Sequence, residues 1–167
     1  MEIVNKVAQS GILTLELDKQ INDKKIVLFD LKDFLFQGLV LKEKEFRYAL
    51  KNLETESFHG KYVGVFCSTD AIVPLWAYML IASKLEGICT SITFGNKSKV
   101  EELMINDWID QLNPNDFEEK RVVIKGCFEK PIPTSAYLRI TQKLKPIVKS
   151  IMYGEPCSTV PIYKQKK

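Results

Sequence analysis

Three of the four cysteines in this 167-residue chain stand where thiolate chemistry could occur. Cys67 ends an apolar run and opens the letters Cys-Ser-Thr, Cys157 opens the same letters, and Cys127 ends the run RVVIKGC. Thiolates hold zinc and iron–sulfur clusters, and a carboxylate such as Asp70 or Glu155 can complete the ligand set. Hydroxyl groups that could contact a bound ligand flank two of these cysteines: Ser68, Thr69, Ser158 and Thr159. The pattern predicts a metal site built on the three cysteines.

The known classes of thiol enzyme fit this pattern poorly. Oxyanion-binding loops need an arginine about six residues after the cysteine, and those positions hold Val73, Pro133 and Tyr163. The single histidine, His59, precedes Cys67 across a predicted strand and lies roughly 25 Å from it at about 3.3 Å per residue. No Cys-x-x-Cys pair is present, which removes zinc-knuckle and thioredoxin-type sites. A thiol-dependent enzyme of another type stays open.

Each cysteine can also be an ordinary packing residue. A free cysteine behaves as a small hydrophobic side chain. Cys89 lies at the start of a predicted strand, and we expect it to pack in the core. In the same interpretation Cys67 packs as well, and one of the three polar residues after it caps the next helix.

The periodicity of apolar residues predicts an α/β fold. Val-, Ile- and Phe-rich runs predict strands at 62–66, 90–94 and 121–125, and each run is followed by a helical pattern. The predicted helices cover 71–85, 99–112 and 135–145. Pro146 interrupts the last helix, and Gly154 suits the position after its end. We therefore expect a mixed sheet with a parallel βαβ core and helices packed on it.

This fold would bring the first two cysteines together. Ligands gather at the carboxyl ends of parallel strands, where Cys67 and Cys127 follow strands 62–66 and 121–125. Cys67 would also precede a helix N-terminus directly, and such a position favours a thiolate.

Length and composition suit one cytoplasmic domain over residues 1–167. Its N-terminal segment, 1–58, is expected to extend the sheet and add a helix, and 164–167 to form a basic frayed tail. The N-terminus lacks the apolar core of a signal peptide, and the longest apolar run is too short to span a membrane. In a reducing compartment the cysteines are expected to be thiols or ligands. The net charge of +3 does not by itself argue for nucleic acid, and no membrane partner is expected.

Several long segments resemble the Bacteroidetes family known as domain of unknown function 2480. They include CSTDAIVPLWAYMLIASKL, RVVIKGC and KPIVKSIMYGEPCSTVPIYK, and the resemblance runs nearly end to end. The family carries no established activity. Its members resemble companions of iron–sulfur assembly genes, which implies an accessory role in cluster assembly. The expected cofactor is then zinc or an iron–sulfur cluster, and the expected partner is an iron–sulfur assembly protein or a second copy. The alternative is a metal-free adaptor or small-ligand-binding protein with structural cysteines.

Overall fold

The computed structural model describes residues 11–126, 130–155 and 158–166. Its contacts divide the chain into two compact units. Unit 1 comprises Met1–Ile21 and Met104–Lys167, and unit 2 comprises Asn22–Leu103. Each unit has its own open sheet with parallel strands and helical residues packed on it, so the predicted α/β class is confirmed.

Unit 2 is built on a parallel three-stranded sheet in the order β2-β3-β4. The strands are β2 (Ile26–Asp30), β3 (Tyr62–Phe66) and β4 (Ser91–Phe94). Their β-branched and aromatic residues favour extended structure. Val63, Gly64 and Val65 of the central strand β3 are buried in succession, as expected for a parallel strand covered on both faces.

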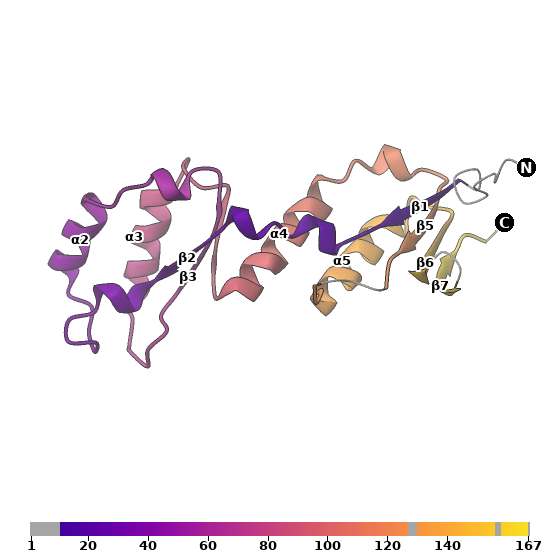
Figure 1. Ribbon diagram of the computed structural model, residues 1–167. Helices are drawn as coiled ribbons and strands as arrows, with labels where there is room; N and C mark the ends of the chain where they lie inside the picture. The colour runs from indigo at the N-terminus through magenta and orange to yellow at the C-terminus, as the bar shows by residue number, and fades with distance from the viewer. Residues whose placement is uncertain (1–10, 127–129, 156–157, 167) are drawn as a thin grey trace, which may run out of the picture. The chain divides into compact units, whose positions relative to one another are not determined.

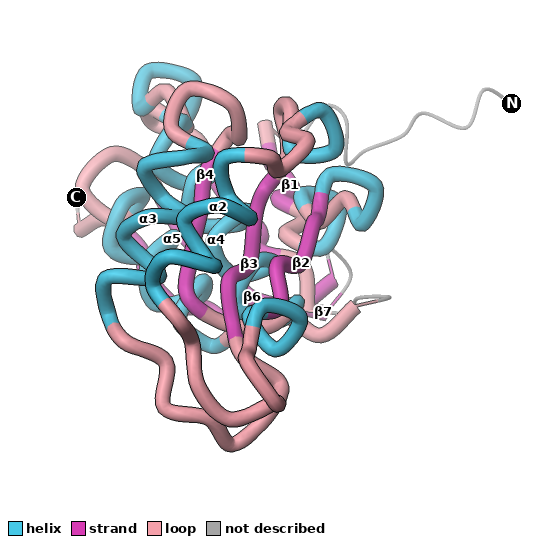
Figure 2. Tube along the Cα trace, turned by 90° about the vertical axis from the view of Figure 1, so that its left-hand side faces the viewer, coloured by secondary structure: helices cyan, strands magenta, loops and turns pink. Residues whose placement is uncertain are grey.

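Helices cover both faces of the unit 2 sheet. On one face lie α2 (Glu43–Lys51) and α3 (Leu75–Leu85), which appear in front of the sheet in Figure 2 and share a buried cluster with it. On the other face Val100 of α4 (Lys97–Gln111) packs over Gly64 of β3. A Cβ atom at Gly64 would lie 2.7 Å from both the carbonyl oxygen of Gly95 and a methyl group of Val100. The absence of a side chain at Gly64 therefore permits this close packing.

Unit 1 contains a mixed four-stranded sheet in the order β1-β5-β6-β7. Parallel strands β1 (Ile12–Leu15), β5 (Arg121–Ile124) and β6 (Ser150–Glu155) are followed by antiparallel β7 (Ser158–Lys164). Ile12 of β1 pairs with Arg121 of β5, although the two residues are far apart along the chain. Figure 1 accordingly shows indigo β1 beside orange β5.

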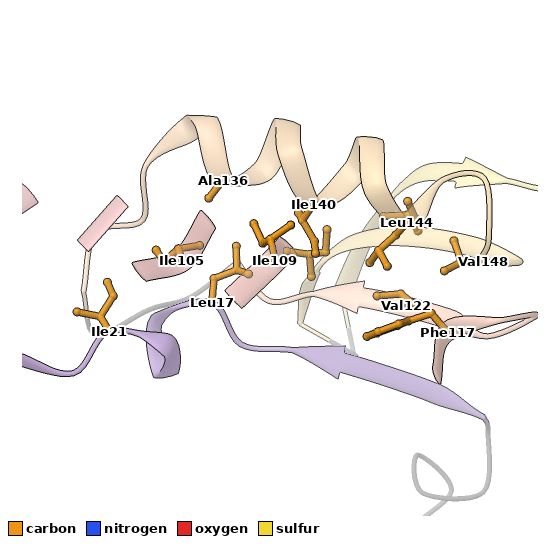
Figure 3. Close-up of a cluster of buried hydrophobic side chains, with 12 residues drawn as sticks. Leu17, Ile21, Ile105, Ile109, Phe117, Val122, Ala136, Ile140, Leu144 and Val148 are labelled. Atoms are coloured by element: carbon orange, nitrogen blue, oxygen red, sulfur yellow. The ribbon is translucent and has the colours of Figure 1, made fainter. Parts of the chain in front are cut away.

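One amphipathic helix closes the core of unit 1. In α5 (Thr134–Leu144) the buried residues Ala136, Ile140 and Leu144 recur every four positions and form one helical face. Figure 3 shows this face packed against Ile109 of α4 and Val122 of β5. Short 3-10 helices connect the larger elements of the chain: Asp18–Gln20, Asp23–Lys25, Leu31–Phe34, Glu56–Phe58 and Pro114–Phe117.

Two expectations about the arrangement of elements are corrected. β3 and β4 are parallel neighbours as predicted. β5, which was expected in the same sheet, belongs to the other sheet instead. There it pairs with β1, while β3 pairs with β2. Residues 150–155, predicted to end a helix, form β6 and pair with β7 in a hairpin.

The C-terminal tail and the number of domains were also predicted from the sequence. Lys164 lies in β7, and the backbone N–H of Gln165 donates to the carbonyl oxygen of Lys149 at 2.9 Å, so this part of the expected frayed tail is bound to the sheet. The single domain over residues 1–167 stays a prediction. Among the described helices, none has the length and apolar character needed to cross a membrane.

Candidate functional site

Cys67 lies in a loop at the carboxyl end of β3 in unit 2. Its half-buried Sγ atom is 3.3 Å from the hydroxyl of Thr69, while Ser68 and Asp70 are exposed. The helix that follows begins at Leu75 rather than at residue 71, and Pro74 stands at its N-cap position without a side-chain cap. Cys67 is therefore separated from the helix N-terminus that was expected to favour its thiolate.

The other predicted ligands belong to unit 1. Cys127 and Cys157 lie outside the described residues. Glu155 ends β6, and its Oε1 atom is buried and has no hydrogen-bond partner among the described residues. Ser158 is exposed at the start of β7, and the hydroxyl of Thr159 donates to the sulfur of Met152 at 3.7 Å.

The structure does not assemble these residues into one described site. Cys67 and Asp70 belong to the sheet of unit 2, whereas Glu155 belongs to that of unit 1. The expected single sheet that was to bring Cys67 and Cys127 to one edge is replaced by two sheets. Within the described part of the chain, no group of three or more His, Cys, Asp or Glu residues is placed to hold a metal ion.

Cys89 packs as expected. It lies in the turn before β4, half-buried against the core cluster of unit 2. Burial, which disfavours the thiolate, raises the pKa of Cys89 above its ordinary value. The pattern of a small apolar residue before a strand thus predicted its environment correctly.

A carboxylate that the sequence analysis did not select holds the carboxyl end of the unit 2 sheet together. Asp30 ends β2, and its Oδ1 atom accepts hydrogen bonds from the backbone N–H groups of Ser68 and Lys32, both at 3.0 Å. Burial acts to raise the pKa of Asp30, but these hydrogen bonds, with the charge of Lys32, outweigh burial and lower it. Asp30 thereby fixes the loop of Cys67 to the neighbouring strand.

The surface beside this loop is apolar and open to solvent. Four large side chains are at least 70% exposed, and together we call them the apolar edge: Ile72 (89%), Leu75 (80%), Met79 (71%) and Phe94 (70%). Leu75 and Met79 lie one turn apart on α3. The ring of Phe94, at the end of β4, meets the ring of Tyr78 edge-on at 5.5 Å between centroids. An exposed group of this kind is typical of an interaction surface.

A small cavity of about 170 Å³ adjoins the apolar edge. It lies between α3, which contributes Tyr78 and Ala82, and β4, which contributes Ile92 and Phe94. β4 is the last strand of its sheet, and within the described residues no strand pairs with its outer side. The cavity therefore lies beside backbone groups that are available to another strand.

The carboxyl end of the unit 1 sheet is polar instead. Lys125 Nζ donates to Glu16 Oε1 at 3.2 Å, and the hydrogen bond raises the pKa of Lys125. The rings of Tyr137 and Tyr153 meet edge-on at 5.8 Å. Burial, followed by the nearby Tyr153 and Asp18, raises the pKa of Tyr137 to about 12.

Sequence reasoning missed the apolar edge because the apolar pattern of helix 71–85 does not show which of its side chains stay exposed. A helix that is apolar all round is normally buried, yet Met79 faces solvent. The signal for Asp30 was local: an aspartate just after an apolar strand often accepts a hydrogen bond from the N–H group two residues later.

Comparison with known proteins yields one family. The family model described as Protein of unknown function (DUF2480) matches residues 1–165, nearly the whole chain. No curated protein and no solved structure matches the chain.

Proposed function

Because the chain belongs to the DUF2480 family, whose description assigns no activity, we propose a function from the surface of unit 2. The protein is an adaptor that binds an extended, apolar segment of another protein along β4. The observation that carries this proposal is the apolar edge, which lies beside a strand with no partner on its outer side among the described residues.

The chemistry of β4 favours strand addition. Natural proteins protect open edge strands with charged residues, proline or bulges, whereas β4 reads Ser-Ile-Thr-Phe and has none of these. A partner strand would gain main-chain hydrogen bonds along β4, and one of its apolar side chains would enter the cavity beside Tyr78. Met79 and Phe94 would then cover the next apolar side chain on the same face of the partner.

The size of the surface favours a short segment over a second copy of this chain. Four large apolar side chains at this exposure present on the order of 500 Å². A stable interface between two folded proteins needs about 800 Å² from each partner. The loop and helix that carry the edge, residues 67–79, contain Asp70 and neither Lys nor Arg. This composition does not suit an anionic membrane surface.

Selection of peptides tests the proposal. A displayed library of random peptides of about eight residues is selected on the full chain and counter-selected on the Phe94→Lys variant. We expect binders with alternating apolar residues that protect the backbone amides of residues 91–94 from hydrogen exchange. Phe94→Lys and Met79→Lys should each weaken binding at least about tenfold, since each places a charge in an apolar contact.

Tyr48→Lys is the matched control, because Tyr48 is 72% exposed on α2 and lies outside the apolar edge. It should leave binding unchanged. Binders that protect other residues, or that ignore Phe94→Lys, would overturn the proposal. A concentration-dependent dimer that Phe94→Lys abolishes would assign the edge to a second copy instead.

Metal binding is the second candidate function. In this proposal Cys67, Cys127 and Cys157 hold zinc or an iron–sulfur cluster with Asp70 or Glu155, and the protein assists iron–sulfur assembly. The observation that favours it is Glu155, because a buried carboxylate oxygen without a hydrogen-bond partner is costly unless a cation or water satisfies it.

Metal and sulfide analysis after anaerobic purification tests this candidate independently of peptide binding. Serine at position 127 or 157 should remove most of the bound metal, while Cys89→Ser should not change it. Folded protein that holds neither metal nor cluster after reconstitution would exclude the metal function and leave the adaptor proposal standing.

A further inference from the structure

A larger cavity, of about 380 Å³, lies on unit 1 at the end of the sheet where β5 and β6 begin. Three cationic side chains line it: Arg121, Lys149 and Lys164. Its apolar lining includes Met152 and Tyr163. The cavity thus combines positive charge with an apolar wall, a combination that neither proposed function uses.

The strand register explains why the cations gather there. Arg121 on β5 pairs with Ser150 on β6, and Ser150 pairs with Lys164 on β7. Paired residues point to the same face of a sheet, and neighbouring strands lie about 4.8 Å apart. The backbones of Arg121 and Lys164 are therefore roughly 10 Å apart, with the hydroxyl-bearing Ser150 between them.

Lys149 is positioned by the same part of the sheet. Its backbone N–H donates to the carbonyl oxygen of Lys120 at 2.8 Å, and its carbonyl oxygen accepts from Gln165 at 2.9 Å. These bonds hold Lys149 directly before β6, beside the row formed by Arg121 and Lys164. Three side chains from three strand ends thus converge on one cavity.

The cations of this cavity have no carboxylate partner among the described residues. The cavity lining contains no Asp or Glu. Elsewhere in unit 1, by contrast, Lys125 pairs with Glu16, and Arg139 pairs with Asp110. Since like charges repel, three unpaired cations around one cavity favour the binding of an anion.

We propose that this cavity binds a phosphate monoester that carries an apolar or aromatic group, such as a nucleoside monophosphate. Arginine and lysine bind phosphate oxygens by charge-assisted hydrogen bonds, and the Ser150 hydroxyl adds a donor. Met152 and Tyr163 contact the apolar group. The volume falls within the range of about 300–1,000 Å³ that is typical of small-molecule sites, and the cations surround one hollow rather than form a long stripe.

Titration of the isotope-labelled full chain, followed by its amide NMR spectrum, tests the site with adenosine monophosphate, adenosine and inorganic phosphate. We expect adenosine monophosphate to shift amides near residues 121, 149–152 and 162–164 in a saturable way. Adenosine should bind at least about tenfold more weakly, because it lacks the charged group. Raising the salt from about 50 mM to about 300 mM should weaken binding several-fold.

Charge-removing variants complete the experiment. Arg121→Gln and Lys164→Gln should each weaken binding at least about fivefold. Lys44→Gln, which removes an exposed cation of unit 2, should leave it unchanged. The amide spectra also show directly whether each variant remains folded. The proposal is overturned if no saturable shift appears up to about 10 mM ligand, if adenosine binds equally well, or if Lys44→Gln has the same effect. Affinity that rises with the length of a single-stranded RNA would replace the small ligand by a nucleic acid.

Discussion

The carboxyl ends of the two parallel sheets differ in the chemistry that they present. In unit 2 the end is held by Asp30 and bordered by exposed apolar side chains such as Phe94. In unit 1 it carries the Lys125–Glu16 pair and two tyrosines whose rings meet edge-on. Both sheets are built from similar β-branched strands, so the loops and strand ends, and not the sheet type, determine what each unit can bind.

The largest effects are expected from the two separate cores. Phe46 is buried in unit 2 against the rings of Phe34 and Trp76, at 5.4 and 6.2 Å between centroids. Phe46→Ala should lower the free energy of unfolding of unit 2 by about 3–5 kcal/mol. Ile140→Ala should lower that of unit 1 by about 3 kcal/mol. Urea unfolding followed by tryptophan fluorescence measures both effects.

Each unit contains one tryptophan, which separates the two signals. In a Trp108→Phe background Trp76 reports unit 2, and in a Trp76→Phe background Trp108 reports unit 1. We expect Phe46→Ala to move mainly the Trp76 transition. Equal shifts of both transitions would instead support the predicted single domain. Phe46→Leu, a milder change, keeps the comparison measurable if the alanine variant does not fold.

A smaller contrast is expected between two glycines. At Gly64 of unit 2 an added Cβ meets the backbone oxygen of Gly95 at 2.7 Å, which side-chain rotation cannot relieve. At Gly126 of unit 1 the nearest atom belongs to the ring of Tyr153, at 3.0 Å. We expect Gly64→Ala to cost about 2–3 kcal/mol of unfolding free energy and Gly126→Ala about 1 kcal/mol or less. Similar losses for both, in the same urea measurement, would contradict this contrast.

A pH-dependent effect is expected at Asp30. Asp30→Ala removes an acceptor for two backbone N–H groups and should cost unit 2 about 1–2 kcal/mol near neutral pH. Because the pKa of Asp30 is lowered in the fold, its contribution is present above the ordinary value of about 3.9 and is lost as the pH falls through the folded pKa. The difference in unfolding free energy between wild type and variant, measured with Trp76, should therefore narrow as the pH falls below the ordinary value of about 3.9.

Asp33→Ala is the control for this prediction, because Asp33 is exposed in the 3-10 helix that directly follows Asp30. It should change the stability of unit 2 by less than about 0.5 kcal/mol. A wild-type advantage over Asp30→Ala that stays constant from neutral to acid pH would show that the hydrogen bonds to Asp30 do not depend on its charge.

The local elements of this fold could be predicted better than their partners. The run Tyr62–Phe66 was identified as a strand with the bounds of β3, because its apolar and β-branched residues favour a buried strand. The hairpin of β6 and β7 was missed because Gly154 indicated the end of a helix. Pro161 is tolerated because β7 is an edge strand. No periodicity states which strand pairs with which, so the division into two sheets was not predictable.

The candidate sites depended on the same missing information. The Cys-Ser-Thr segments are visible in the sequence, but the meeting of Cys67 with Cys127 was inferred from one shared sheet, whereas the described strands form two sheets. The apolar residues of α3 were equally visible, yet the exposure of Met79 depends on what the tertiary fold leaves uncovered. The three cations at Arg121, Lys149 and Lys164 are brought together only by the register of three strands.

The pairing of Ile12 with Arg121 has a consequence for synthesis on the ribosome. Strand β1 is made first, but its partner lies 121 − 12 = 109 positions later. At about 5–20 residues per second, β1 waits roughly 5–20 s before β5 is translated. All three strands of unit 2 are translated within that interval, so unit 2 can fold while unit 1 is still incomplete. The order of translation therefore allows unit 2 to fold before unit 1. Until β5 is translated, β1 must not pair with any other strand of the nascent chain.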